Sequence, residues 1–502
     1  MSSAAKATAP FLASAGELVR MLRAKKIGAL ELLELQLERV RQVNPAINGI
    51  VAIDEESARR QAKRADDALA AGKPIGPLHG LPMTLKDTFE VVGMPATAGI
   101  VALKDHMPQR DADIVTALKQ SGAIIFGKTN VPVAAGDHQS YNPIYGLTRN
   151  PWNLGHSAGG SSGGAAASLA AGMTPLEIGS DVGGSIRCPA HFCGVYGHKP
   201  SYGIVPLRGH IPGPPGTLSE PMMAVAGPLA RSAADLELAL DVVAAPGELD
   251  RKGKLWRLPP ARHERLKDFR VALWADSKHY PVEPSYLDAI HAFANDLRKL
   301  EVKIDDQARP AIDPVQSNET YVASLFGMWG NSLPDDLFDA YAKAAVGLDP
   351  ADKSWAAQIG RATTQTVRNW NRLIERRERM RRAWAAFFEN YDVLIAPVMT
   401  TLAFPHDTSG VDHTAQLHRT IKVGNETRPY LDNLIWPGLI TVVNLPATAL
   451  PTRRFVDGLP AGVQVAGDYL EDRTTLRFAA LVEQAIGGFI APDDKLFVAA
   501  KT

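Results

Sequence analysis

The sequence contains only two cysteines, Cys188 and Cys193, in 502 residues. Two thiols cannot form a disulfide framework, so the chain does not belong to the small cystine-rich scaffolds. An excess of charge of one sign is also missing, because 54 basic residues balance 54 acidic residues. A polyanion-binding surface, and nucleic acid as a partner, are therefore not expected.

Long apolar runs are missing as well. No segment approaches the length that a membrane-spanning helix needs. The N-terminal segment lacks the apolar core of a signal peptide. We therefore expect a soluble, cytoplasmic protein that has no membrane partner.

Apolar residues recur at helical spacing in the first part of the chain. Ser14 and Glu17 match a capping box ahead of a first helix. A second helix is predicted at about 29–43, ended by Pro45, and a third at about 55–71. We expect residues 1–75 to be N-terminal covering helices on one continuous catalytic core, residues 76–502.

Short apolar runs alternate with helical patterns through the rest of the chain, which predicts one α/β structure. Residues 133–152 and 195–228 have the turn-rich composition of loops. Strands are predicted at 81–87, 123–126, 176–178, 270–274, 393–397, 439–443 and 462–466, and helices at 113–121, 165–171, 232–243, 284–300, 354–390 and 474–485.

Two short motif matches lack their structural context. Residues 122–129 fit the P-loop pattern, but the residues between the two glycines are themselves an apolar strand, so nucleotide binding is not expected. Residues 159–163 fit the nucleophile elbow of α/β-hydrolases, which needs a strand directly before the serine. We predict that residues 153–158 do not form a strand, and we therefore reject the α/β-hydrolase fold.

Cys188, His191 and Cys193, with His198 nearby, could suggest zinc. The spacing lacks paired ligand motifs, so two partly buried thiols are the preferred interpretation. We expect no metal and no cofactor.

Glycine and serine gather between residues 155 and 189, in two groups, 159–164 and 183–185. Glycine allows tight turns and close approach of the backbone. A serine in such a turn can have its hydroxyl beside several backbone N–H groups, and acyl transfer needs this combination of nucleophile and oxyanion donors.

Taken together, these segments resemble the amidase signature family over nearly the whole chain. The resemblance implies a single large α/β domain whose mixed central β-sheet is covered by helices on both faces. The matching segments are PLHGLPMTLKDTF, GKTNVP, NPWN, GGSSGGAAASLAAG, GSDVGGSIRCPAHFCGVYGHKPSYG and, more weakly, GLPAGVQVAG.

The resemblance implies a Ser–Ser–Lys triad. Ser185 would be the acylated nucleophile, Ser161 the bridging serine after a cis peptide bond from Gly160, and Lys86 the terminal base. A free lysine is protonated at neutral pH, but burial lowers its pKa. The apolar run before Lys86 suits a desolvated amine, provided that Asp87 points away. Read alone, Lys86 would instead be a strand-end lysine in solvent.

The loop around Ser185 would hold the oxyanion. The backbone amides of Val182, Gly183, Gly184 and Ser185 can converge on it. We interpret Asp181 and Arg187 as a structural pair that fixes this loop. By resemblance, the loop 134–137, with Ala135 and Gly136, lines the acyl site.

Four further residues, Phe326, Met328, Trp329 and Trp436, are candidates for an outer wall, although aromatics also fill ordinary cores. If they line the site, an aryl or bulky apolar amide is the favoured substrate. Carbamate or ester hydrolysis with the same triad is one alternative. A glutaminase-type subunit of a tRNA-dependent amidotransferase is another, but no arginine anchor for a small amino acid follows Gly136. We consider a homodimer as the assembly.

Overall fold

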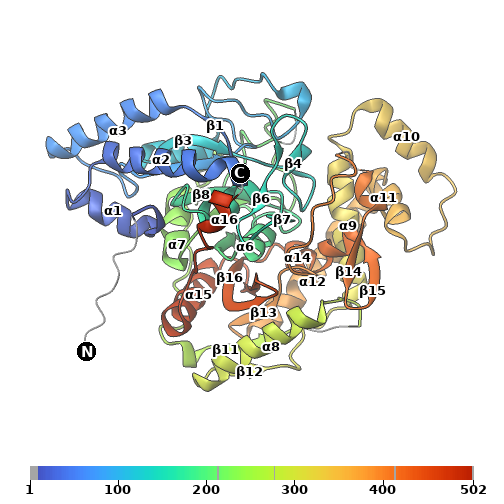
Figure 1. Ribbon diagram of the computed structural model, residues 1–502. Helices are drawn as coiled ribbons and strands as arrows, with labels where there is room; N and C mark the ends of the chain where they lie inside the picture. Colours follow the sequence, from blue (N-terminus) through green and yellow to red (C-terminus); the bar gives the residue numbers. More distant parts are fainter. Residues whose placement is uncertain (1–9, 212–213, 276–277, 412–413, 500–502) are drawn as a thin grey trace.

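The computed structural model describes residues 10–211, 214–275, 278–411 and 414–499 (Figure 1). Eight strands form a central sheet in the order β12-β11-β13-β17-β16-β9-β10-β8. The β11 strand is parallel to both of its neighbours, whereas the pairs from β13 to β8 are antiparallel, so the sheet is mixed as expected. The strands are β8 (Leu176–Asp181), β9 (Tyr196–Lys199), β10 (Val225–Ala230), β11 (Arg270–Leu273), β12 (Lys303–Asp305), β13 (Val393–Pro397), β16 (Ala447–Val456) and β17 (Leu459–Ala466).

A second sheet has the order β1-β3-β2, with β1 (Ile50–Ile53) antiparallel and β2 (Pro82–Lys86) parallel to β3 (Ile124–Thr129). Its β2 strand contacts β8, the edge strand of the central sheet. The first 75 residues thus supply the strand β1 as well as helices. The division expected between residues 75 and 76 separates β1 from its sheet partners β2 and β3. Three ribbons complete the strands: β4 (Tyr141–Asn142) with β5 (Gly146–Leu147), β6 (Arg149–Asn150) with β7 (Asn153–Ser157), and β14 (Thr420–Val423) with β15 (Glu426–Pro429).

The N-terminal helices are α1 (Ala15–Arg23), α2 (Ala29–Ile47) and α3 (Glu55–Ala70). The predicted capping box before α1 is confirmed, because Ser14 Oγ accepts from the Glu17 amide and Glu17 accepts from the Ser14 amide. The prediction that Pro45 ends the second helix is wrong. A proline removes only one helical hydrogen bond and is tolerated near a C-terminus, and α2 ends instead at the left-handed Asn48.

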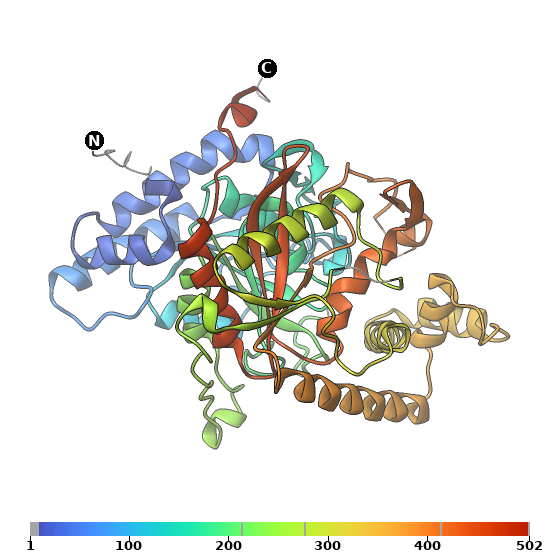
Figure 2. The same cartoon turned by 90° about the horizontal axis from the view of Figure 1, so that it is seen from below.

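Several of the other helices flank the central sheet, as predicted, whereas α11 packs against α9, and α10 against α11. In Figure 2, α8 lies across the strands, and α6, α8 and α15 contact β16 and β17. Within the described part of the chain, no helix is long and apolar enough to cross a bilayer. The helices are α4 (Asp113–Gln120), α5 (Gly163–Ala170), α6 (Arg187–Cys193), α7 (Ala233–Val243), α8 (Pro284–Lys299), α9 (Pro314–Gly330), α10 (Asp335–Ala345), α11 (Trp355–Thr363), α12 (Val367–Phe388), α13 (Ala415–His418), α14 (Ile435–Thr441), α15 (Asp472–Ile486) and α16 (Lys495–Ala499), with short 3₁₀ helices η1 (Pro10–Leu12), η2 (Val101–Leu103), η3 (Val133–Ala135), η4 (Asp250–Lys252), η5 (Leu266–Asp268) and η6 (Tyr430–Leu434).

Four local predictions are wrong. The run at 439–443 lies in and just after the helix α14 rather than in a strand, because a short, fully buried apolar run has no period that separates the two. The predicted loop at 195–228 contains β9 and β10, glycine- and proline-bearing strands held by the sheet. The helix predicted at 354–390 is two helices, α11 and α12. Residues 153–157 are a strand, β7, which pairs with β6 outside the central sheet and also forms an isolated antiparallel bridge from His156 to Pro405.

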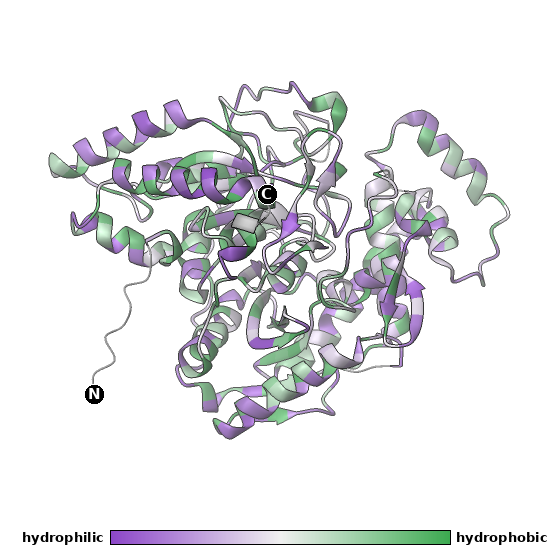
Figure 3. Ribbon diagram, in the orientation of Figure 1, coloured by the Kyte–Doolittle hydropathy of each residue, from purple (hydrophilic) through white to green (hydrophobic). Residues whose placement is uncertain are grey.

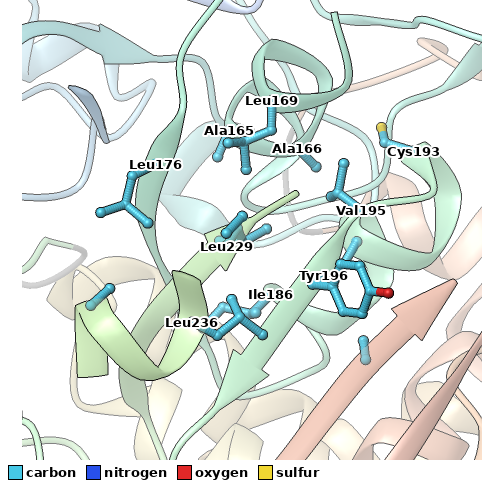
Figure 4. Close-up of a cluster of buried hydrophobic side chains, with 14 of the residues drawn as sticks. Ala165, Ala166, Leu169, Leu176, Ile186, Cys193, Val195, Tyr196, Leu229 and Leu236 are labelled. Carbon is cyan, nitrogen blue, oxygen red and sulfur yellow. The ribbon is translucent and has the colours of Figure 1, made fainter. Parts of the chain in front are cut away.

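The core lies between the sheet and its helices. Figure 4 shows one cluster in which Ala165 and Leu169 of α5 face Leu229 of β10, with Leu236 of α7 nearby. Alanines on α5 let this helix pack closely, and every residue of α5 is buried. Hydrophilic residues gather instead on peripheral helices such as α3 (Figure 3). This packing fixes the segment from α5 to α6, on which the candidate site is built.

Candidate active site

Lys86 lies at the C-terminal end of β2 and is fully buried. Its Nζ donates to Ser161 Oγ at 2.7 Å and to Ser180 Oγ at 3.0 Å. The interpretation of Lys86 as a solvent-facing lysine is therefore wrong, and the structure brings together two of the three residues predicted for the triad.

The surroundings of Lys86 favour a neutral amine. Burial lowers the pKa of Lys86 to about 7, and the acidic residues Asp181 and Glu177 only partly oppose this effect. A large share of the lysine is thus uncharged near neutral pH. An uncharged amine can accept a proton, which an ordinary surface lysine cannot do.

Asp87, the next residue along the chain, has its partners elsewhere and not at the Lys86 amine, which is the condition that a neutral amine at Lys86 requires. Its carboxylate pairs with Lys128 Nζ at 3.5 Å and accepts from the Thr97 hydroxyl. Burial raises the pKa of Asp87, and Lys128 and Thr97 offset part of this rise. Lys128, not Lys86, is therefore the partner of this carboxylate.

Ser161 lies in the turn before α5, and the peptide bond between Gly160 and Ser161 is cis, as the resemblance implies. A Cβ atom on Gly160 would lie 2.2 Å from the Asp137 carbonyl oxygen, so only glycine fits there. The next amide, that of Ser162, donates to the Ser185 carbonyl at 3.1 Å. This bond ties the Ser161 turn to the Ser185 loop.

The Ser185 loop connects β8 to α6 and is held by a buried ion pair. Asp181 contacts Arg187 at 2.9 Å and accepts from the amides of Gly184 and Ile186. Although burial opposes it, Arg187 lowers the pKa of Asp181 to about 2, so this carboxylate stays charged. The pairing predicted for Asp181 and Arg187 is confirmed, and Ser185 lies inside the loop that it fixes.

The amides of this loop differ in what they bind. The Gly184 amide already donates to Asp181 at 3.0 Å. Among the described residues, the amides of Val182, Gly183 and Ser185 meet no acceptor. Their role as oxyanion donors remains a prediction, and the Gly184 amide is the one of the four that has another partner.

The predicted acyl loop is held from one side by the segment 415–430. Gln416 Nε2 donates to the Gly136 carbonyl at 2.6 Å, and Arg419 pairs with Asp137. Ala135 has a φ of 53°, in the left-handed region. Ala135 and Gly136 thus lie in a tightly bent loop. Asp137, the residue that follows Gly136, packs closely against Gly160.

Comparison with known proteins agrees with this geometry. A family model described as Amidase matches residues 31–476. The chain belongs to the amidase signature family. It is 31% identical to an acylamidase from Rhodococcus erythropolis over 94% of each chain, and 31% identical to an indoleacetamide hydrolase from Bradyrhizobium diazoefficiens over 94% of this chain and 86% of that protein. The crystal structure of a bacterial aryl acylamidase superposes with a TM-score of 0.79 at 25% identity, covering 97% of this chain and 98% of the other. The protein is thus an amide hydrolase.

The aromatic residues considered for the outer wall of this amidase separate into two groups. Trp436 is fully buried, packs against Tyr280 and donates to the Pro281 carbonyl, so it is a core residue. Phe326 and Trp329 are partly exposed on α9 and contact each other edge to face. Only these two, with Met328 between them, remain candidates for the wall.

The histidines and thiols considered for zinc have other partners in this amidase. His191 Nδ1 accepts from the Gly462 amide at 2.7 Å, and His198 binds Asp472 and Thr448. Both cysteines are fully buried, free thiols. No group of three possible ligands lies together in the described ranges.

Sequence reasoning missed three residues that contact this site. Ser180 binds Lys86, and its place in the serine-rich stretch was a signal that could have found it. His138 Nε2 donates to the Gly183 carbonyl at 2.8 Å. Tyr321, on α9, donates to the Val182 carbonyl at 3.0 Å. No pattern in the sequence links α9 to the Ser185 loop.

Proposed function

We propose that this amidase hydrolyses a small amide with an aryl or bulky apolar part, through a covalent acyl-enzyme on Ser185. The observation that carries the proposal is the 2.7 Å contact between the buried Lys86 amine and Ser161 Oγ. It supplies a base with a pKa near neutral beside a hydroxyl that can relay a proton.

The chemistry follows from these groups. Lys86 accepts the proton of Ser161 as Ser161 takes that of Ser185, whose oxygen attacks the amide carbonyl. Free loop amides stabilise the oxyanion, each contributing roughly 3–4 kcal/mol in comparable sites. The proton returns through Ser161 to the leaving nitrogen when the carbon–nitrogen bond breaks. Water then repeats the attack on the ester and releases the acid.

The substrate class rests on two supports. The relatives are named for acyl amides and indoleacetamide, and the solved neighbour is an aryl acylamidase. The second support is that the half-buried Phe326 and Trp329 belong to α9, the helix whose Tyr321 contacts the Ser185 loop. Arg419, beside the acyl loop, is already neutralised by Asp137, which disfavours a site built to bind the free carboxylate of glutamine.

The decisive experiment labels the enzyme with a fluorophosphonate and locates the adduct by mass spectrometry. We expect the label on Ser185. Ser185→Ala should lower anilide hydrolysis by about 10⁴-fold or more. Retained turnover in Ser185→Ala, or a label elsewhere, would refute the mechanism. A panel of anilides, carbamates, esters and glutamine then identifies the leaving group, and faster turnover of a carbamate, an ester or glutamine would replace the amide assignment.

A neighbouring pair of serines provides a matched control. Ser161→Ala removes the proposed relay, whereas Ser162→Ala removes a buried hydroxyl that has no partner among the described residues. We expect a large loss of kcat for Ser161→Ala and near wild-type kcat for Ser162→Ala. The reverse result would exchange the roles of the two serines.

A further inference from the structure

Three consecutive peptide units of the Ser185 loop are held by different groups. Tyr321 Oη donates to the Val182 carbonyl at 3.0 Å, His138 Nε2 donates to the Gly183 carbonyl at 2.8 Å, and the Cys188 amide donates to the Gly184 carbonyl at 2.6 Å. In a trans peptide the C=O and N–H bonds point in opposite directions. A donor that holds the carbonyl therefore also aims the amide of the following residue.

The amide ends of these units show an alternating pattern. The middle unit is held at both ends, because its Gly184 amide donates to Asp181. The first and third units are held only at their carbonyls, which leaves the amides of Gly183 and Ser185 without an acceptor in the described part of the chain. Two free donors thus flank one fixed unit. We propose that Tyr321 is a positioning residue that aims the Gly183 amide at the oxyanion, and that His138 supports it by fixing the middle unit.

The packing around Tyr321 agrees with this role. Its ring is fully buried, and a Cβ on Gly438 of α14 would lie 2.4 Å from its Cδ1 atom. A Cβ on Gly183 would lie 3.2 Å from Tyr321 Oη, so the hydroxyl presses closely on the loop. The phenol has little room for another orientation. Its hydrogen bond therefore fixes a single plane for the Val182–Gly183 peptide.

The proposal rests on the proposed function, since it assumes an oxyanion formed at Ser185. Tyr321→Phe deletes only the hydroxyl. We expect kcat to fall about 10-fold, less than the 10²–10³-fold loss of a whole donor, while KM changes less than about twofold. A substrate-matched trifluoromethyl ketone, which becomes an oxyanion on the serine, should bind about 10-fold more weakly. The corresponding alcohol, which forms no oxyanion, should bind equally to both enzymes.

Tyr280→Phe is the matched control. Tyr280 is also buried, and its hydroxyl donates to a backbone carbonyl, that of Pro314, at the start of the same helix α9. This variant should keep wild-type kcat and ketone affinity. At His138, the variant His138→Gln places an amide donor near the original Nε2 position and should keep most of kcat. His138→Leu loses the donor and should lower kcat about threefold, because Asp181 still holds the other end of the middle unit.

The outcomes separate the two proposals. Full activity and full ketone affinity in folded Tyr321→Phe would overturn the positioning role, as would an equal loss of ketone and alcohol binding. If Tyr321→Phe does not fold, the same measurements on His138→Gln and His138→Leu decide, and equal values for these two would overturn it. Activity retained in Ser185→Ala would instead refute the proposed function, whatever the result at Tyr321.

Discussion

Lys86 and Lys128 lie on adjacent parallel strands, at neighbouring positions in the register of β2 and β3, and both are fully buried. Their partners differ. Lys128 contacts the Asp87 carboxylate and donates to the Phe89 and Pro95 carbonyls. Within the part of the chain that the structure describes, the Lys86 amine hydrogen-bonds to the hydroxyls of Ser161 and Ser180 and to no carboxylate.

The difference between the two lysines is one of proton chemistry. Carbonyl and carboxylate oxygens hold an ammonium group but have no proton to give to an amine. A hydroxyl can both accept from an ammonium and donate to a neutral amine. Burial lowers the pKa of both lysines, but for Lys128 the carboxylate opposes the effect at contact distance. The same buried residue type is therefore structural in one place and suited to catalysis in the other.

The sharpest test exchanges each lysine for methionine, which keeps the length of the side chain. Lys86→Met should lower kcat by about 10³-fold or more and leave the protein folded, because it removes the proposed base. The rate of anilide hydrolysis tests the loss of kcat, and circular dichroism of the same sample tests whether the variant is folded. If Lys86→Met keeps more than a tenth of wild-type kcat, the base is another group.

Lys128→Met should act on stability instead. It leaves Asp87 buried without its cation, which costs about 3–5 kcal/mol in the free energy of unfolding. Urea denaturation measures this loss. The double variant Lys128→Met/Asp87→Asn removes both charges and should recover much of it. Equal instability of the single and double variants would show that Lys128 stabilises by packing and not by pairing.

The expected roles of these lysines show how far sequence reasoning extends. The resemblance to the amidase signature family implied that Lys86 and Ser161 meet, and alternating strands and helices predicted the α/β class. Neither could show which lysine Asp87 contacts, since adjacent residues on a strand face opposite sides and the partner comes from another strand. The predicted strand at 439–443 lies in and just after α14, because tertiary packing decides the state of a short buried run.

Long-range contacts were the least predictable part of the site. Tyr321 and Val182 are 139 residues apart in the chain. The aromatic residues near Tyr321 suggested an apolar wall. The hydrogen bond from the Tyr321 hydroxyl to the Val182 carbonyl, however, depends on where α9 packs against the Ser185 loop. Trp436 was a candidate for the wall, with the core as the alternative, and it is part of the core. Local sequence patterns indicate which face of a helix or strand is buried and where turns occur. They do not identify the residue from a distant segment that a side chain contacts.

The pH dependence of activity tests the neutral state of Lys86. A base must be unprotonated in the free enzyme, so kcat/KM for a neutral anilide should fall about 10-fold per pH unit well below pH 7 and level off above it. The direction follows from the pKa of about 7, because protonation of Lys86 at lower pH removes the base. A profile that is flat from pH 5 to 9 would exclude Lys86 as the titrating group, and a rise only above pH 9 would mean that burial does not depress its pKa.

The smallest expected effect concerns Ser180, the second hydroxyl that distinguishes Lys86 from Lys128. Ser180 Oγ accepts from Lys86 Nζ, and an acceptor stabilises the ammonium form more than the neutral amine. Ser180→Ala should therefore move the midpoint of the kcat/KM profile to lower pH while reducing the plateau only a few-fold. A Ser180→Thr variant keeps the hydroxyl and should restore the midpoint. A midpoint that moves to higher pH in Ser180→Ala would show that this hydroxyl acts mainly as a donor to the neutral amine, and the comparison between the two lysines would then rest on Ser161 alone.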